Sequence, residues 1–249
     1  IYDNGSMAWR KLDVLRYVDR VCISLSTLNP ALQNLMCETP NAFEYALRSI
    51  ELLKKKKIGV TVSILISGLN LDEAPVMIEY FGKRRIPVVL SLYNDISLQN
   101  SLVKIGIHND QYQIQIHALL KFIRKLRVLK KKFPVYLDAK TINSIEKLCL
   151  EGVRNWRCGS FSSFFMVNEK GYVSGCHVMP PLCKIWELPK FWEDEKMEQL
   201  RRTYSLCEKC TYLCYIAYSH LKNIQNLFEY FLEYEIRKLQ SFLGWKEID

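Results

Sequence analysis

GVTVSILIS, residues 59–67, is the stretch that decides the fold class of this chain of 249 residues. Valine and isoleucine dominate it, and the nearly continuous apolar run is typical of a strand buried on both faces. Parallel sheets are built from such strands, because crossover helices cover their faces. The run therefore predicts a central strand of a parallel sheet in an α/β fold.

The neighbouring segments alternate strand-like and helix-like patterns, as a parallel sheet requires. Further strands are predicted at 19–25, 86–92 and 134–139, and helices at 42–57, 71–85, 110–132 and after Thr141, which we expect to cap its helix. These segments form four βα units with right-handed crossovers. A closed eight-unit barrel takes about 250 residues by itself. The segment is therefore either a small open sheet or the later part of a barrel whose beginning is absent.

The bulk composition, with 49% hydrophobic and 24% charged residues, is that of an ordinary globular protein. No apolar run approaches the roughly 18 residues that span a bilayer, and the N-terminal stretch lacks the apolar centre of a secretory signal. We therefore expect a cytoplasmic protein with no membrane partner.

The net charge is +9, and two basic runs stand out, residues 54–57 and 130–132. Each run closes a predicted helix, where cations complement the helix dipole and stay solvated. Neither is interleaved with aromatic residues that could stack on bases. We therefore expect no nucleic-acid partner.

The pattern changes near Glu151-Gly152. Residues 162–176, SSFFMVNEKGYVSGC, predict a β-hairpin in which Gly171 supplies a positive φ. Residues 193–206 predict a helix, and 216–243 predict a last helix whose apolar stripe docks on the body, since charges of both signs alternate along it. The expected parts are an α/β part at 1–151, a cysteine-rich part at 152–215 and a C-terminal helix at 216–249.

Five of the nine cysteines are spaced like metal ligands: Cys158, Cys176, Cys207, Cys210 and Cys214. Two residues between Cys207 and Cys210 let both thiols point into one turn, as at four-thiolate zinc and iron-sulfur sites. The hairpin would bring Cys158 and Cys176 together, and in a reducing compartment clustered thiols bind metal more often than they form disulfides. Zinc and iron-sulfur both remain open. The seventeen residues between Cys158 and Cys176 favour iron-sulfur over a zinc ribbon.

The other four cysteines are expected to be structural. Free cysteine behaves as a small apolar residue, so Cys22 and Cys37 are predicted to be buried, and Cys149 and Cys183 lack closely spaced partners. The sequence contains no nucleophile elbow and no Walker-type glycine loop.

Cys158, Gly171, Cys176 and the Cys207/Cys210 pair resemble the auxiliary-cluster domain, SPASM or its shorter twitch form, of radical S-adenosylmethionine (SAM) enzymes. Upstream, DNGSM (3–7), DRVCISLS (19–26) and SGLN (67–70) are similar to strand ends in the later part of the barrel of those enzymes. The resemblance covers residues 1–215. It implies a partial (β/α) barrel of the radical SAM type followed by a small cysteine-rich domain of a β-hairpin and helix.

The resemblance also implies the site. Cys158, Cys176, Cys207 and Cys210 would ligate one auxiliary 4Fe-4S cluster, with Cys214 as a competitor for one position. Ser24 would lie near the SAM ribose. A 5′-deoxyadenosyl radical would abstract hydrogen from a small-molecule, peptide or protein substrate in the complete enzyme.

The sequence departs from the family pattern in three places. The Cys-x3-Cys-x2-Cys loop, which holds the cluster that cleaves SAM, is missing from the sequence. Ser26 stands where the family usually has Asp, and Cys37 lies near the position where the family commonly has an Arg. Either the N-terminal strands and loop are lost from this chain, as the start at Ile1 favours, or the protein is a degenerate relative. The chain alone is expected not to cleave SAM. The alternative is a non-enzymatic zinc-binding interaction module on an α/β body, whose positive charge meets an acidic partner.

Overall fold

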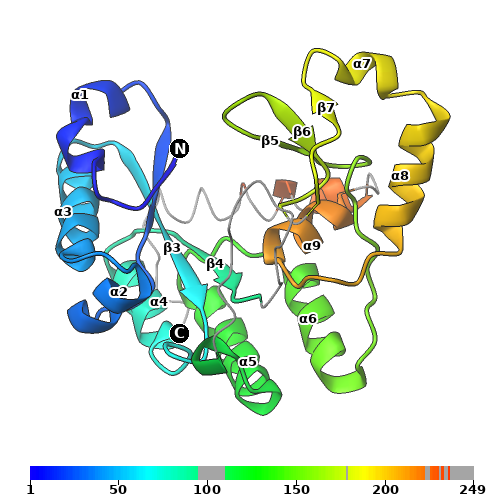
Figure 1. Ribbon diagram of the computed structural model, residues 1–249. Coiled ribbons are helices and arrows are strands. Elements are labelled where there is room, and N and C mark those ends of the chain that lie inside the picture. The colour runs from blue at the N-terminus through cyan, green and yellow to red at the C-terminus, as the bar shows by residue number, and fades with distance from the viewer. Residues whose placement is uncertain (95–109, 178, 222–224, 230, 233–234, 236–249) are drawn as a thin grey trace. The chain divides into compact units, whose positions relative to one another are not determined.

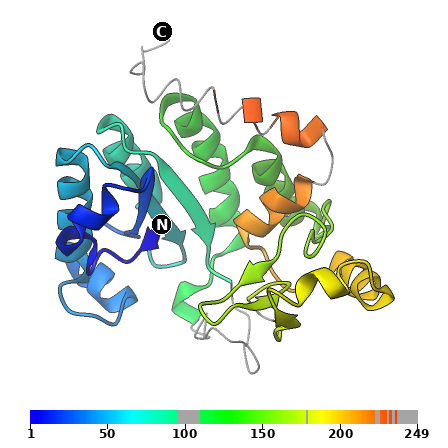
Figure 2. The same ribbon diagram turned by 90° about the horizontal axis from the view of Figure 1, so that it is seen from above.

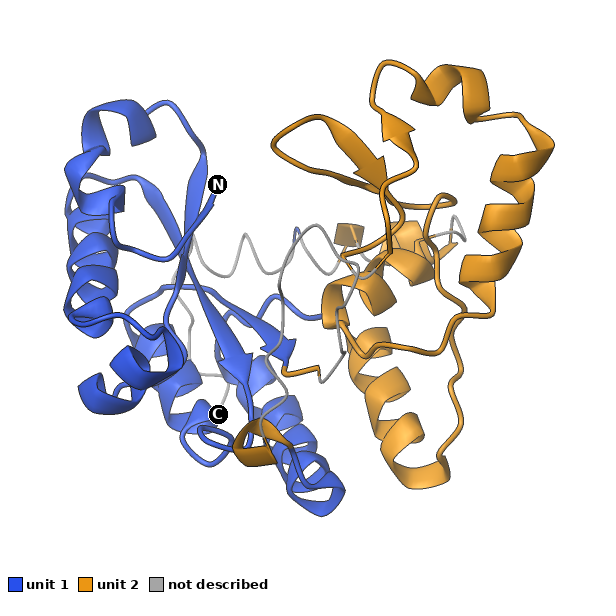
Figure 3. Ribbon diagram, in the orientation of Figure 1, with its two compact units in different colours: residues 1–92, 114–137, 234–249 blue, residues 93–113, 138–233 orange. Residues whose placement is uncertain are grey.

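The computed structural model describes residues 1–94, 110–177, 179–221, 225–229, 231–232 and 235 (Figure 1). It divides into two compact units (Figure 3). Unit 1 comprises residues 1–92, 114–137 and 234–249, and unit 2 comprises residues 93–113 and 138–233. The boundary expected near Glu151-Gly152 lies inside unit 2.

Unit 1 is built on a parallel sheet whose strands are β1 (Tyr2–Asp3), β2 (Arg20–Ser24), β3 (Gly59–Ile66) and β4 (Val88–Leu92). The spatial order β1-β2-β3-β4 follows the chain without reversal. Right-handed crossovers in such an order place every helix on the same face, whereas a doubly wound sheet reverses its order. The fold is therefore α/β, with a sheet of the barrel type rather than the doubly wound type.

The helices of unit 1 are η1 (Ala8–Arg10), α1 (Leu12–Leu15), α2 (Pro30–Met36), α3 (Ala42–Lys55), α4 (Ala74–Lys83) and α5 (Ile116–Lys132). Figures 1 and 2 show α3, α4 and α5 along one face of the sheet. On β3 the alternate residues Val62, Ile64 and Ile66 are fully buried, and α3 and α4 both contact this strand. The apolar run that decides the fold class is thus the centre of the sheet.

Asn70 joins the carboxyl ends of β2 and β3. Its buried amide Nδ2 donates to Ser26 O (2.6 Å) and Leu65 O (2.7 Å), and Oδ1 accepts from Ser67 N (2.8 Å). Ser26 Oγ in turn accepts from Leu65 N (3.1 Å). These bonds satisfy backbone groups that the sheet ladder leaves at the strand ends.

Unit 2 contains a second, smaller sheet. Its elements are η2 (Asp110–Tyr112), α6 (Ala139–Glu151), β5 (Met166–Val167), β6 (Tyr172–Ser174), β7 (Cys183–Lys184), α7 (Leu188–Phe191), α8 (Glu195–Ser205) and α9 (Leu213–His220). β5 and β6 form the predicted hairpin, and β7 adds a third antiparallel strand. Gly171 has φ 74°, as predicted, and Asn168 Oδ1 accepts from Tyr172 N (2.8 Å) across the turn.

Two local predictions are wrong. Asp138, not Thr141, is the N-cap of α6: Asp138 has extended backbone and its Oδ1 accepts from Thr141 N (2.7 Å). The strand expected at 134–139 is reduced to one parallel bridge between Val135 and Val88, because the chain turns into α6 directly afterwards.

Burial corrects two further expectations. Cys22 and Cys183 are buried and Cys149 is half-buried, but Cys37 is exposed because α2 ends at that residue. Residues 54–57 are exposed as expected, whereas Lys130 is buried. Lys130 lies on the apolar face of α5, where the methylene stem of a lysine can pack.

The tail expected as one helix over 216–243 is described in part. α9 ends at His220, residues 225–229 are helical, and 236–243 lie outside the described residues. Phe228, Phe231 and Leu232 are exposed, contrary to the expected docking. Within the described residues, no helix is long and apolar enough to cross a membrane.

Asn70→Ala should lower the free energy of unfolding by about 2–4 kcal/mol, because two buried carbonyls and one buried N–H lose their partner. The measurement is urea denaturation followed by circular dichroism. Asn4→Ala is the matched control: Asn4 is exposed and accepts one bond, from Ser6 N (3.0 Å), so its loss should cost under about 1 kcal/mol. Equal effects would show that Asn70 does not join the strand ends as described.

Candidate metal centre

Tyr204 contacts three cysteine-bearing segments of unit 2. It lies in the last turn of α8, and its ring packs edge-on against Phe161 (5.7 Å between centroids). Its hydroxyl accepts from the backbone N–H of Gly175, and its carbonyl oxygen accepts from Cys207 N (2.9 Å). Each contact lies at or close to a predicted ligand in the sequence. The packing of this one side chain therefore gathers the candidate site.

Two buried hydrogen bonds fix the segment that follows Cys158. Ser160 Oγ donates to Gly175 O (2.8 Å), which ties this segment to the residue before Cys176. Gly159 N donates to Ser219 Oγ (2.7 Å) in α9. The first pair of predicted ligands is thus held together by backbone contacts next to each thiol.

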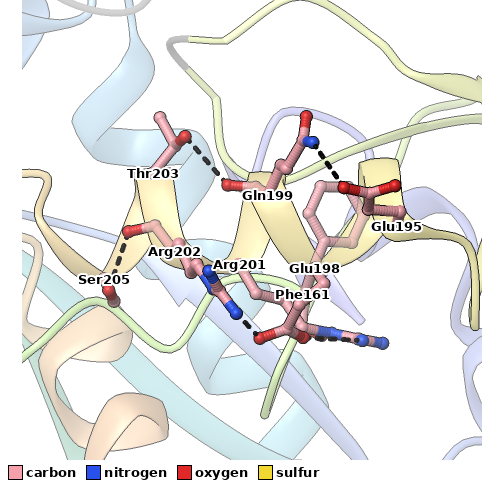
Figure 4. A network of polar contacts seen from close by, with 8 residues as sticks. All are labelled: Phe161, Glu195, Glu198, Gln199, Arg201, Arg202, Thr203 and Ser205. Carbon is pink, nitrogen blue, oxygen red and sulfur yellow. Dashed lines mark hydrogen bonds and ion pairs between the residues drawn. The ribbon is translucent and has the colours of Figure 1, made fainter.

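Arg201 joins α8 to the same segment (Figure 4). Its Nε donates to Phe161 O (2.9 Å) and its Nη2 donates to Trp192 O (2.9 Å). Glu198 lies 3.5 Å from Arg201 and 3.6 Å from Arg202, but Glu198 is half-exposed and such pairs contribute little. The backbone contacts of Arg201, rather than the ion pairs, position the helix that leads into Cys207.

The second pair of predicted ligands lies in the loop between α8 and α9. Tyr212, the N-cap residue of α9, closes this loop. Burial raises the pKa of Cys210 to about 11, and the backbone N–H of Tyr212, which donates to the Cys210 sulfur, opposes the increase. An N–H donor favours the thiolate, which is the form that ligates a metal.

Four of the five predicted ligands lie in one neighbourhood. Burial raises the pKa of Tyr204, and the thiols of Cys176, Cys158 and Cys207 add to the increase. Cys158 and Cys207 act in the same direction on Cys210. Cys158, Cys176 and Cys207 thus act on Tyr204, and Cys210 is linked to Cys158 and Cys207.

Cys214, the fifth predicted ligand, follows the loop in the sequence. It is exposed in the first turn of α9 and acts electrostatically on Tyr212 and Tyr215. His177 is half-buried and stacks on Tyr215 (5.6 Å between centroids). Burial lowers the pKa of His177, so its ring is neutral at pH 7.

The chemistry of the donor set can be compared with metal preferences. In the part of the chain that the structure describes, no three His, Cys, Asp or Glu side chains are arranged to hold a metal ion. Cys176 lies in the apolar cluster around Phe161, Tyr204 and Tyr215, and Cys158 and Cys210 pack against it. Several thiols in apolar surroundings suit zinc or an iron-sulfur cluster and do not suit magnesium or calcium. The type of donor therefore fits a thiolate-bound group, whereas the described side chains are not arranged as a metal site.

Ser24, the predicted cofactor residue, lies in unit 1. It ends β2, is exposed, and is in register with Ser63 of β3, while Ser91 of β4 is in register with Leu65. Because alternate residues share a face, Ser24, Ser63 and Ser91 lie on the face opposite the fully buried residues of β3. The sheet therefore has one apolar face and a second, more polar face, the polar face, which carries the three serines together with Leu65 and Val89.

Sequence reasoning missed Ser63, Ser91 and Tyr204. A signal existed for Ser63, because Thr61 and Ser63 alternate with apolar residues inside GVTVSILIS. No local signal marks Tyr204, since its role depends on segments far away in the chain.

Comparisons with known proteins bear on the fold. Family models and curated proteins give no match. The solved structure of native anSMEcpe with bound AdoMet and Cp18Cys peptide is similar, with a TM-score of 0.59 and 15% identity over 96% of this chain and 74% of that chain. The structure with bound AdoMet and Kp18Cys peptide has a TM-score of 0.58 at 15% identity, with the same coverage. These neighbours are radical SAM proteins, so the chain has their fold: a partial α/β barrel and a small additional domain.

Gly175→Ala should destabilise the candidate centre. A Cβ at Gly175 would overlap the ring of Tyr204 and Ser160 Oγ, so both must move. We expect a loss of about 1–3 kcal/mol, typical of overpacking, measured by thermal denaturation. Ser162→Ala, at an exposed position in the same unit, is the control and should change little. An unchanged melting temperature for Gly175→Ala would contradict the close packing of Tyr204.

Proposed function

We propose that this chain is part of a radical SAM enzyme that modifies a peptide, protein or small-molecule substrate and that holds one auxiliary 4Fe-4S cluster. The observation that carries the proposal is that three thiols from separate segments, Cys158, Cys176 and Cys207, act electrostatically on Tyr204, while Cys158 and Cys210 pack against the apolar cluster that contains Cys176. The similarity of the fold to that of radical SAM proteins supports it.

Cys158, Cys176, Cys207 and Cys210 are the proposed ligands, and Cys214 is the competitor for one position. A bound cluster of this kind supplies one-electron chemistry at a potential that the protein sets. The chain contributes the apolar setting around Tyr204 and Tyr215, and the N–H of Tyr212 favours the thiolate of Cys210.

The polar face of the sheet is the proposed SAM site, with Ser24 beside the ribose. Parallel sheets bind ligands at the carboxyl ends of their strands, where Ser24 lies. The hydrogen bonds of Asn70 hold the backbone of this edge. The sequence has no Cys-x3-Cys-x2-Cys motif, so we do not expect these 249 residues alone to cleave SAM.

The substrate class follows from the neighbours by analogy. Native anSMEcpe has been solved with AdoMet and with the Cp18Cys and Kp18Cys peptides. We therefore propose a peptide or a peptide-like small molecule as the substrate of the complete enzyme. We further propose the cytoplasm as its location, since a reducing compartment keeps the thiols available.

Cys176→Ser and Cys210→Ser should each remove most of the bound iron, because a hydroxyl replaces a thiolate ligand. The chain is purified without oxygen and reconstituted with iron and sulfide, and iron, sulfide and zinc are measured per chain. We expect about four irons and four sulfides in the unaltered chain, the content of one 4Fe-4S cluster.

Cys183→Ser is the matched control. Cys183 is buried in the same apolar cluster as Cys176 but is not a proposed ligand, so this variant should keep its iron. Cys22→Ser, in β2, is a second control. Equal iron loss in Cys183→Ser and Cys176→Ser would refute the ligand set. One zinc and no iron in the unaltered chain would instead support the zinc-binding interaction module.

A further inference from the structure

Tyr212 is placed beside the proposed cluster by its position in the chain and by its packing. It lies between Cys210 and Cys214 in the sequence, and it has extended backbone (φ −61°, ψ 114°) at the N-cap of α9. Its ring packs edge-on against Tyr215 (5.3 Å between centroids) and against His177 (6.1 Å). It also packs against the apolar cluster to which Cys176 belongs.

The hydroxyl of Tyr212 is buried without a hydrogen-bond partner among the described residues. The neighbouring buried tyrosines differ. The Tyr204 hydroxyl accepts from Gly175 N, and the Tyr215 hydroxyl accepts from His177 N (3.3 Å). A buried tyrosine hydroxyl normally has a partner, and one that lacks it calls for an explanation.

Three thiols act electrostatically on this side chain. Cys210, Cys176 and Cys214 are the side chains that act electrostatically on the Tyr212 phenol after burial, which is the main cause of its raised pKa. Two of these are proposed cluster ligands. Tyr212 already donates its backbone N–H to the sulfur of Cys210. A buried O–H donor without a partner among the described residues therefore lies in a region where thiols act on it, and sulfur accepts hydrogen bonds once it is a thiolate.

We propose that Tyr212 is a positioning residue that donates a hydrogen bond from its hydroxyl to a sulfur of the auxiliary cluster or of its cysteine ligands. This inference rests on the proposed function. Hydrogen bonds to the sulfurs help to set the reduction potential of an iron-sulfur cluster, because they stabilise the more negatively charged, reduced state. Tyr212 would therefore raise the potential of the cluster without ligating it.

The test compares Tyr212→Phe with Tyr218→Phe in the full chain, reconstituted with iron and sulfide. Tyr218 is the matched control because it also lies near Cys214 but is exposed. Iron and sulfide per chain are measured first. The midpoint potential is then found by redox titration followed by electron paramagnetic resonance. Tyr212→Phe should keep the iron content and shift the potential to a more negative value, and Tyr218→Phe should change neither.

The outcomes separate the two proposals. An unaltered chain that binds no iron overturns the proposed function and this inference with it. Full iron in Tyr212→Phe at the unaltered potential overturns the inference alone. If Tyr212→Phe loses its iron, the Tyr212→His variant distinguishes a donor role from a packing role, because an imidazole N–H can also donate a hydrogen bond. Iron retained in Tyr212→His supports the donor role, and iron lost from both variants shows that Tyr212 only supports the packing.

Discussion

The packing of Tyr204 is the contact on which the cysteine centre depends. The proposed ligands of the centre are at positions 158, 176, 207 and 210, which no single helix or hairpin can bring together. Tyr204 meets the first segment through Phe161, the second through Gly175 and the third through Cys207. Glycine at position 175 is required because any larger residue would overlap the tyrosine ring. The segments of the proposed site are held in place by the fold, so the binding of a metal group does not have to order them.

The parallel sheet of unit 1 provides a different kind of site. Its strands follow the order of the chain, so every crossover helix lies on one face and the opposite face stays open to polar residues. Ser24, Ser63 and Ser91 occupy that face, and Asn70 holds the adjoining strand ends with buried hydrogen bonds. The helices thus pack on one face of the sheet, which forms the core of unit 1, and the three serines lie on the other face.

Sequence patterns predicted the helices and strands well where these depend on residues close together in the chain. The alternating strands and helices and the hairpin with Gly171 at positive φ follow from side-chain periodicity and turn chemistry. The wrong predictions share a cause, since each concerns burial or a hydrogen bond that depends on the neighbours of a residue in space. Cys37 is exposed because α2 ends there, and Lys130 is buried because it lies on the packed face of α5. Asp138, rather than Thr141, caps α6 and accepts from Thr141 N in its first turn.

The sequence by itself determined the α/β class, the hairpin and the spacing of five thiols, because periodicity and spacing act between residues close together in the chain. Tertiary structure alone decided which side chains the thiols act on, since Cys158, Cys176 and Cys207 act on Tyr204, and Cys176, Cys210 and Cys214 act on Tyr212. It also decided that the hydroxyl of Tyr212 is buried without a hydrogen-bond partner among the described residues. The physical reason is that burial and hydrogen-bond satisfaction depend on neighbours from distant segments, which no local pattern contains.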